Sequence, residues 1–288
     1  MKQAPITVII PTHNRAHMLP EAIKSVLNQT LPVEQIIVVD DGSTDNTKDA
    51  ITPLINKQLI LIRQPHQGVS AARNRGLSHA KTPWVAFLDS DDRFLKRKIE
   101  KQWAAIVEHP GMKLHHCDER WVRNGQHLNP MKKHDKSMSS PFRESLERCM
   151  ISPSSVIIDR LLLKSIGGFD ETLPACEDYD LWLRICASHP IFFLPEKLLI
   201  KNGGHSDQLS RQYWGMDRFR IQSMENLLQS TILTDQQLNW LYPVLIKKIN
   251  IVLHGAKKRG HQAVIDCYEH KLLTHQARMR ERNDCSAG

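Results

Sequence analysis

The sequence predicts an α/β fold, in which a mixed, mostly parallel sheet is flanked by helices and followed by a C-terminal helical extension. Two patterns lead to this prediction. Through the first hundred residues, short and almost wholly apolar runs alternate with helical periodicity, which is typical of parallel strands covered on both faces. Beyond residue 210 only the helical periodicity continues. We therefore expect a first domain over residues 1–205, with halves at 1–110 and 111–205, and a helical extension over 206–288.

The first half alternates expected strands with expected helices. Apolar, β-branched runs predict strands at residues 6–10, 35–39, 59–62 and 84–88. Apolar residues that recur at i, i+3 and i+4 predict an amphipathic helix over 19–29. Ser43 or Thr44 can cap a second helix, and Gly68 introduces a third that ends near residue 80.

The second half predicts a less regular succession of elements. Asn124-Gly125 suits the type I′ turn of a hairpin over 121–128. The remaining strands are expected at 154–159, 191–194 and 197–201, and the helices from 160 to Ile166 and at 177–188, with a turn at 167–170 between them. From Arg211 we expect helix to about residue 282, with breaks at 231–235, Gly255 and Gly260.

The chain of 288 residues carries 39 Lys and Arg against 31 Asp and Glu, a formal net charge of +8. Such an excess suits an anionic ligand, an anionic membrane surface or nucleic acid. Apart from short clusters such as 96–98 and 257–259, however, the basic residues are scattered. We therefore expect most of them on solvated surface, and we expect no nucleic-acid partner.

The six cysteines lie far apart and form no C-x-x-C pair, which argues against a zinc ribbon or a disulfide framework. No apolar run approaches the roughly 20 residues that span a bilayer. The N-terminus runs directly into a strand-like segment and lacks the apolar core of a signal peptide. We therefore expect a cytoplasmic protein, and peripheral association with the inner face of a membrane is compatible with its charge.

Polar residues follow three of the expected parallel strands, at 12–15, 40–41 and 89–92. The carboxyl ends of parallel strands meet at one edge of a sheet, where ligands bind. The carboxylates of Asp89, Asp91 and Asp92 lie within four positions and repel one another unless a cation or solvent relieves them. Mg²⁺ and Mn²⁺ prefer such oxygen ligands, often with phosphate oxygens. The alternative is an Asp- and Ser-rich turn without a ligand.

Several motifs occur one after another along the chain. They are VIIPTHNR (8–15), VVDDGSTD (38–45), GVSAARNRG (68–76), FLDSDD (87–92) and EDYDLWLR (177–184). Together they resemble the inverting family-two glycosyltransferases, nucleotide-sugar enzymes with the Rossmann-like GT-A fold, over about residues 5–205. The resemblance implies a GT-A catalytic domain whose nucleotide-binding half is 1–110 and whose acceptor half is 111–205.

The resemblance implies nucleotide binding by Pro11, Thr12, His13, Asp41, Arg73, Asp89 and Ser90. The ring of His13 would stack on the base, with a surface imidazole as the alternative. Asp41 matches the carboxylate that accepts a hydrogen bond from uracil N3–H, and an ionised carboxylate is an acceptor only. Arg73 would reach the nucleotide or its pyrophosphate, with a helix-surface cation as the alternative.

The same resemblance assigns a metal site and a base. Asp91 would hold Mn²⁺ or Mg²⁺ against the diphosphate, Asp89 would bind the ribose or a metal-bound water, and Asp92 could substitute for either. The metal would neutralise charge on the departing nucleoside diphosphate. Asp178 aligns with the general base that takes the proton of the acceptor hydroxyl in an inverting transfer. The alternative is that the acids of 177–180 only face a helix dipole.

Four further sites in the sequence have assignments of their own. His205, in a Gly-rich segment, is a candidate metal ligand, with a solvent-facing loop histidine as the alternative. The run 115–117 (HHC) is expected at a strand edge, since no partner lies at zinc-ligand spacing. Asp40 would support the turn that contains Gly42. Asn74 could bond either locally or to the ligand.

The implied function is metal-assisted, inverting transfer of a sugar from a nucleotide-diphosphate sugar, above all a UDP-sugar, to a hydroxyl of a saccharide or lipid-linked saccharide acceptor. Synthesis of a surface polysaccharide or lipopolysaccharide would be its setting. The alternative is a catalytically silent nucleotide-sugar-binding subunit or sensor on the same fold. A dinucleotide-dependent oxidoreductase is disfavoured because the first turn has no G-x-G-x-x-G, and a nucleotidyltransferase because no Gly-rich, Lys-bearing loop lies near the N-terminus.

The C-terminal helices are expected to pack on the first domain. Covering the acceptor site, dimerisation and contact with a membrane surface are the alternatives. The sequence identifies neither the sugar, nor the acceptor, nor the oligomeric state.

Overall fold

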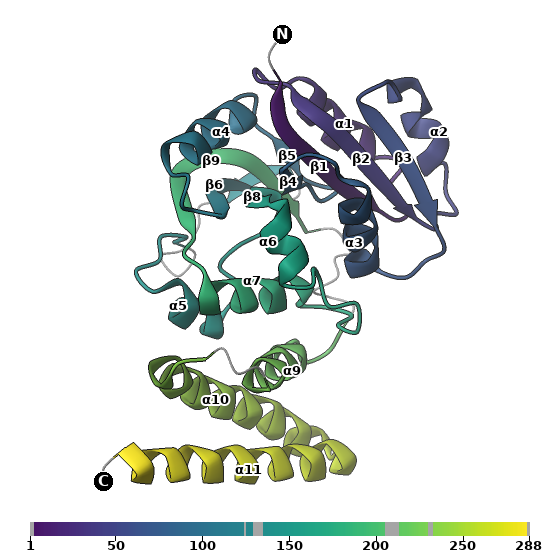
Figure 1. Cartoon of the computed structure of the whole chain (residues 1–288). Coiled ribbons are helices and arrows are strands. Elements are labelled where there is room, and N and C mark those ends of the chain that lie inside the picture. Colours follow the sequence, from purple (N-terminus) through teal and green to yellow (C-terminus); the bar gives the residue numbers. More distant parts are fainter. Residues whose placement is uncertain (1–2, 124, 129–134, 205–212, 230–232, 287–288) are drawn as a thin grey trace.

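The computed structural model describes residues 3–123, 125–128, 135–204, 213–229 and 233–286. In these residues one sheet forms the centre of the molecule, with strand order β3-β2-β1-β4-β8-β6-β9-β5 and with β7 hydrogen-bonded to β6. Figure 1 shows the sheet with helices on both sides, and the last three helices stacked beneath it.

The N-terminal half of the sheet is parallel, as predicted. Its strands are β1 (Ala4–Thr12), β2 (Val33–Asp41), β3 (Leu59–Gln64) and β4 (Trp84–Phe87). The other strands are β5 (Arg93–Phe94), β6 (Leu114–Arg123), β7 (Gln126–Leu128), β8 (Val156–Asp159) and β9 (Phe192–Gly203). β8 is antiparallel to both β4 and β6, whereas the long β6–β9 pairing is parallel. The predicted mixed, mostly parallel sheet is thus confirmed.

Seven helices lie in the part of the chain described before residue 204. They are α1 (Leu19–Leu27), α2 (Thr47–Ile51), α3 (Val69–His79), α4 (Lys98–Glu108), α5 (Pro141–Glu147), α6 (Arg160–Ser165) and α7 (Glu177–Ser188). The sequence did not predict α4 or α5. Most basic residues were expected on solvated surface, but Lys98 of the cluster at 96–98 is wholly buried. Its ammonium donates a hydrogen bond to Gln102 and lies 4.3 Å from the ring centroid of Phe94.

The predicted cap of α2 is wrong. The helix begins at Thr47, after Asn46, rather than after Ser43 or Thr44. The polar groups of the two predicted residues are used elsewhere: the hydroxyl of Ser43 accepts from the Asn14 backbone N–H at 2.8 Å, and the Thr44 N–H donates to the Asn14 side chain at 2.8 Å. Both residues therefore join the loop after β1 instead of starting a helix.

The run 115–117 is not at a strand edge. It lies in β6, which is paired on one side with β8 and on the other with β9. Both His115 and His116 are wholly buried. Burial lowers the pKa of His115 to about 4 and that of His116 to about 3, so both rings are neutral at pH 7.

The predicted hairpin and turn are confirmed, and the two predicted strands near residue 200 form one. Arg123 pairs with Gln126 in the β6–β7 hairpin, where Asn124 lies outside the described residues. Gly167 and Gly168 have φ values of +88° and +70°, as the turn before Phe169 requires. β9 runs through the expected interruption, and its pairing with β6 shifts register there instead.

The C-terminal helices are α9 (Asp217–Leu228), α10 (Asp235–Arg259) and α11 (Gln262–Ser286). The expected helix start at Arg211 lies outside the described residues; in the part described from residue 213 on, the helix begins at Asp217, after Gly215 with φ +61°. Helix α10 continues through Gly255, because a single glycine costs a helix only about 1 kcal/mol. It ends at Gly260 with φ +65°, as predicted. The break at 231–235 lies partly outside the described residues; Thr234 caps α10.

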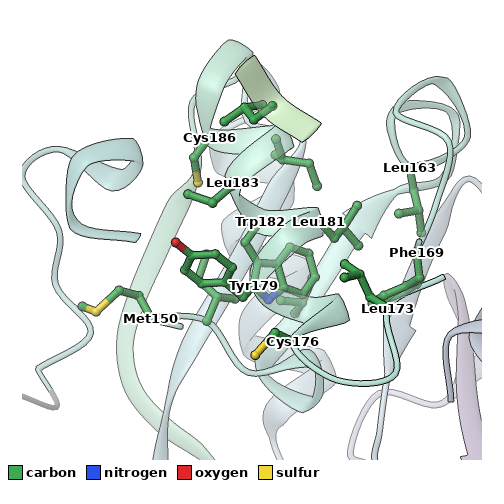
Figure 2. Close-up of a cluster of buried hydrophobic side chains, with 14 of the residues drawn as sticks. Met150, Leu163, Phe169, Leu173, Cys176, Tyr179, Leu181, Trp182, Leu183 and Cys186 are labelled. Atoms are coloured by element: carbon green, nitrogen blue, oxygen red, sulfur yellow. The ribbon is translucent and has the colours of Figure 1, made fainter. Parts of the chain in front are cut away.

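One hydrophobic cluster joins the sheet to these helices. Figure 2 shows Tyr179 and Trp182 of α7 at its centre, both about 1% exposed. The same cluster contains Phe219 and Met224 of α9 and Leu245 of α10. Helices α9 and α10 therefore pack against α7 and α5, as predicted, whereas α11 packs against α10. Within the described residues, none of the helices combines the length and the apolar character needed to cross a membrane.

Candidate functional site

The predicted site residues gather at the edge of the sheet where β1, β2 and β4 end. Thr12, the last residue of β1, pairs with Asp40 of β2. On the other side of β1, Ile9 pairs with Phe87, the last residue of β4. The loops that follow these strands therefore start side by side, as expected for a parallel sheet. Pro11 and Thr12 are buried here, and the Thr12 hydroxyl has no hydrogen-bond partner among the described residues.

Asp41 holds the loop that leads into α3. Its side chain is buried and accepts hydrogen bonds from Gln64 Nε2 at 2.7 Å, the Gln67 N–H at 2.9 Å and the Gly68 N–H at 2.8 Å. His66 Nδ1 lies 2.8 Å from the same carboxylate. An ionised carboxylate offers about four acceptor positions, so a uracil N3–H would have to replace one of these donors.

Two imidazoles stack beside Asp41. The ring centroids of His13 and His66 are 4.1 Å apart with an interplanar angle of 25°. The Nδ1 atoms of both rings lie within hydrogen-bond distance of the Asp41 carbonyl oxygen, at 2.8 and 3.1 Å. His13 was predicted from the sequence, whereas His66 was not. Since His66 follows β3, the rule that site residues follow parallel strands could have identified it.

Asp40 and Asn74 make local contacts. Asp40 accepts from the Ser43 N–H at 2.9 Å and pairs with Arg63 at 3.2 Å, which confirms its expected support of the turn at Gly42. Asn74 donates to the Phe169 carbonyl at 2.8 Å and accepts from the Phe169 N–H at 2.9 Å. Of the two options for Asn74, the structure shows local bonding.

Arg73 joins the loop after β4 to the start of α7. Its guanidinium lies 2.8 Å from Asp89 Oδ1 and 2.6 Å from Glu177 Oε1. The side chain is only 3% exposed, so the alternative of a helix-surface cation is wrong. Burial disfavours its charge, but the two carboxylates outweigh burial and raise the pKa of Arg73. A contact with the nucleotide stays a prediction.

The carboxylates of Asp89, Asp91 and Asp92 converge at the end of β4. One oxygen of each lies within 4.8 Å of the others. Asp92 is buried and accepts from Ser154 Oγ at 2.7 Å and from the Asn202 N–H at 3.0 Å. Burial and the neighbouring charge of Asp91 raise the pKa of Asp92 well above its usual value. Such repulsion between carboxylates fits a divalent cation, for which Asp89 and Asp91 are the candidate ligands.

Two further residues lie next to the candidate metal ligands. Ser90, which stands between Asp89 and Asp91 in the sequence, is buried. The Asn202 side chain donates to the Asp91 carbonyl at 2.6 Å and so ties β9 to this loop. His205, the other predicted metal ligand, lies outside the described residues.

The three acids at the start of α7 have different surroundings. Glu177 pairs with Arg73, and Asp180 pairs with Arg184 at 2.7 Å. Asp178 instead accepts a hydrogen bond from the Tyr179 N–H at 2.7 Å, and its other oxygen lies 3.3 Å from the thiol of Cys149. Among the described residues Asp178 has no ion pair within 4 Å. It is thus the one acid of the three whose charge is not compensated by a bonded arginine.

A lysine faces both groups of acids from β9. Lys201 is near Glu119, Asp92, Asp89 and Asp178, and these charges outweigh burial and raise its pKa. Glu119 forms a buried ion pair with Lys136 at 2.9 Å. Lys201, Glu119 and Cys149 were not predicted from the sequence, because no motif or periodicity relates them to the acids of the site.

Comparison with known proteins shows which family the chain resembles. The family model described as "Glycosyl transferase family 2" matches residues 7–163. An uncharacterized glycosyltransferase of Rickettsia conorii is 33% identical over 196 residues, which are 67% of this chain and 32% of that protein. The chain therefore spans about a third of the length of that relative. WfgD of Escherichia coli, a "UDP-Glc:alpha-D-GlcNAc-diphosphoundecaprenol beta-1,3-glucosyltransferase", is 29% identical over 191 residues, 65% of this chain and 71% of WfgD.

Solved structures confirm the predicted fold. S. aureus TarS 1–349 in complex with UDP-GlcNAc superimposes with a TM-score of 0.75 at 22% identity, covering 96% of this chain and 81% of that chain. The shared architecture is the GT-A arrangement of a mixed, mostly parallel sheet between helices.

Proposed function

Given that the chain belongs to glycosyl transferase family 2, we propose that it transfers a sugar, with inversion, from a UDP-sugar to a hydroxyl of a saccharide or lipid-linked saccharide acceptor. A divalent cation, Mn²⁺ or Mg²⁺, would assist the transfer. Surface polysaccharide or lipopolysaccharide synthesis would be the setting. The name of WfgD, a glucosyltransferase with a lipid-linked acceptor, supports this choice.

One observation carries the proposal, namely the bridge that Arg73 makes between the two groups of acids. One guanidinium contacts Asp89 of the convergent carboxylates and Glu177, the residue before Asp178. It thereby fixes a candidate cation site and a candidate base on either side of a single buried side chain. A metal-assisted transfer needs both in one site, the first at the leaving group and the second at the attacking hydroxyl.

The acids would divide the work as follows. Asp89 and Asp91 would hold the cation, which supplies charge neutralisation for the departing diphosphate. Asp178 would accept the proton of the acceptor hydroxyl while that oxygen attacks the anomeric carbon from the face opposite the leaving group. At the other end of the site, His13 and Asp41 would contact the uracil base. The lipid-linked acceptor would bring the enzyme to the inner face of a membrane.

Two substitutions test this division. Asp91→Asn is expected to abolish the Mn²⁺-dependent part of UDP binding, measured by calorimetry with and without EDTA. Asp178→Asn is expected to keep that binding and to slow transfer by about 10²- to 10⁴-fold, the usual contribution of a general base. Transfer is measured with UDP-glucose and UDP-GlcNAc on a synthetic α-GlcNAc-diphospholipid, and NMR of the product's anomeric proton tests inversion. Thermal unfolding of each variant controls for loss of fold.

The outcomes separate the alternatives. UDP binding without transfer to a panel of acceptors would favour the catalytically silent subunit. Transfer by Asp178→Asn at the wild-type rate would show that Asp178 is not the general base. UDP binding that depends neither on Mn²⁺ nor on the Asp91 carboxylate would exclude the proposed cation site.

A further inference from the structure

We propose that Cys149 is a positioning residue for Asp178, holding the carboxylate in place through a hydrogen bond from its thiol. The inference rests on the proposed function, because it assigns Cys149 a role toward the proposed base. It adds a residue that no motif of the sequence includes.

The contact leaves Asp178 able to accept a proton. Cys149 Sγ lies 3.3 Å from Asp178 Oδ2, within range for a sulfur donor, and the Tyr179 N–H donates to Oδ1 at 2.7 Å. Each carboxylate oxygen thus has one donor from the protein and keeps acceptor capacity for a substrate hydroxyl. The thiol also lies 3.2 Å from the Ile151 carbonyl, so its single hydrogen is shared between the two acceptors.

The segment that carries Cys149 is fixed against α7. The Tyr179 hydroxyl, from the residue after the base, donates to the Leu146 carbonyl at 2.8 Å. On the other side of the thiol, Met150 and Ile151 belong to the hydrophobic cluster around α7, in which Figure 2 labels Met150. The distance between thiol and carboxylate is therefore set by packing at both ends of the segment.

A thiol differs from the partners of the neighbouring acids in its charge. Burial and the charge of Asp178 raise the pKa of Cys149 well above its usual value, so the thiol is protonated and can donate. A neutral, weak donor fixes the direction of a carboxylate and favours its charged form modestly, whereas an arginine favours the charged form strongly. Glu177, which pairs with Arg73, illustrates the second case.

Other titratable groups also face this pair. Cys176, the residue before α7, and Glu177, the first residue of α7, both interact with Asp178. Lys201 interacts with it from β9. Lys136 and Lys201 both act on the Cys149 thiol. These charges stay in place when Cys149 alone is changed, so substitution of Cys149 isolates the effect of its hydrogen bond.

The first experiment measures the contact without relying on activity. Cys149 is alkylated with iodoacetamide between pH 7 and 10, in the wild type and in Asp178→Asn, and the modified peptide is quantified by mass spectrometry. Removing the negative charge should increase the thiolate fraction and speed alkylation about three- to ten-fold at a given pH. The exposed Cys267 in the same sample is the control and should react at an unchanged rate.

The second experiment tests positioning. Cys149→Ala should lower kcat about three- to ten-fold with KM for the UDP-sugar unchanged, because only the base is less well oriented. Since the lost donor favoured the charged carboxylate, the acid limb of the pH–rate profile should move to higher pH. Cys149→Ser retains a donor and should restore most of both. Cys186, a buried thiol on the helix that carries Asp178, provides the matched control, and Cys186→Ser should change neither.

The two experiments separate the inference from the proposed function. If alkylation responds to Asp178 but no transferase activity exists, the proposed function fails while the contact stands. If the enzyme transfers sugar but alkylation ignores Asp178→Asn, the inference is overturned. Equal losses in Cys149→Ala and Cys149→Ser, with an unmoved acid limb, would also overturn it in favour of simple packing.

Discussion

Two short stretches of this chain have nearly the same composition and behave differently. Three carboxylates fall within four positions both at the end of β4, at 89–92, and at the start of α7, at 177–180. In the β4 triad (Asp89, Asp91, Asp92) an oxygen of each side chain lies within 4.8 Å of the others. In the α7 triad (Glu177, Asp178, Asp180) the outer two acids form ion pairs with different arginines.

The difference lies in how the charge is compensated. In the α7 triad Arg73 and Arg184 each take one acid, which leaves Asp178 with the neutral donors Cys149 and Tyr179 N–H. In the β4 triad the described hydrogen-bond donors to Asp92 are neutral, and its burial beside Asp91 disfavours its charge more than the nearby Lys201 favours it. Arg73 pairs with Asp89 and Lys201 lies near Asp89 and Asp92, so the charge of the three converging carboxylates is partly compensated, and the remainder suits a cation. An isolated carboxylate suits proton transfer. The partners of the acids, rather than their spacing, distinguish the two uses.

Arg73→Ala should have the largest effect on stability, because Arg73 is common to both triads. It would leave Asp89 and Glu177 without their cation, and removing one partner of a buried ion pair costs about 3–5 kcal/mol. Urea unfolding followed by circular dichroism measures the change in the free energy of unfolding. Arg75→Ala, an exposed neighbour on the same helix, is the control and should stay within about 0.5 kcal/mol of the wild type. Similar stabilities of the two variants would show that the ion pairs of Arg73 with Asp89 and Glu177 do not stabilise the fold.

Acid should destabilise the protein mainly through β6 rather than through either triad. The folded pKa values of His115 and His116 are about 4 and about 3, below the value of roughly 6.5 in an unfolded chain. The unfolded state therefore binds more protons below pH 6.5, and stability falls as the pH drops from there toward 4, by about 1.4 kcal/mol per pH unit for each ring.

His116→Leu tests this account. The substitution removes the contribution of one imidazole to the pH dependence of the free energy of unfolding. It also removes two buried nitrogens that have no hydrogen-bond partner among the described residues. Urea unfolding at pH 7.0 and 4.5 should show a smaller loss in the variant than in the wild type. An unchanged loss would assign the acid sensitivity to the carboxylates, and would then require the two triads to be compared by pH directly.

Much of the fold could be predicted because its signals are local. The first four strands are apolar runs, and the tips that carry Asp41 and Asp89 follow them directly. The prediction missed α4 and the central position of β6, where polar residues are buried. Lys98 is satisfied by Gln102, and His115 and His116 are held neutral, so a pattern of apolar and polar residues is misleading there.

The site divides in the same way. Motifs in the sequence predicted Asp91 and Asp178 as functional acids, but not what contacts them. Arg73 and Glu177 are 104 positions apart, and Cys149 and Asp178 are 29 apart. Such pairs are formed by tertiary packing of separate elements, and no periodicity of a helix or a strand relates their members. The alternative that Arg73 is exposed was wrong for this reason.

The smallest effect gives the sharpest contrast between the triads, since matched substitutions should have opposite signs. Burial raises the pKa of Asp180 as well, but Asp180→Asn leaves Arg184 without its anion and should therefore destabilise the protein by about 1–3 kcal/mol. Asp92→Asn removes a repelled charge, while an amide can still accept from the Asn202 N–H and can donate to Ser154 Oγ. In EDTA at pH 7 it should stabilise the protein by about 1 kcal/mol, because like charges packed this closely disfavour the fold. Thermal and urea unfolding measure the stability of both variants. If Asp92→Asn lost as much stability as Asp180→Asn, the protein alone would already compensate the charge of the β4 triad.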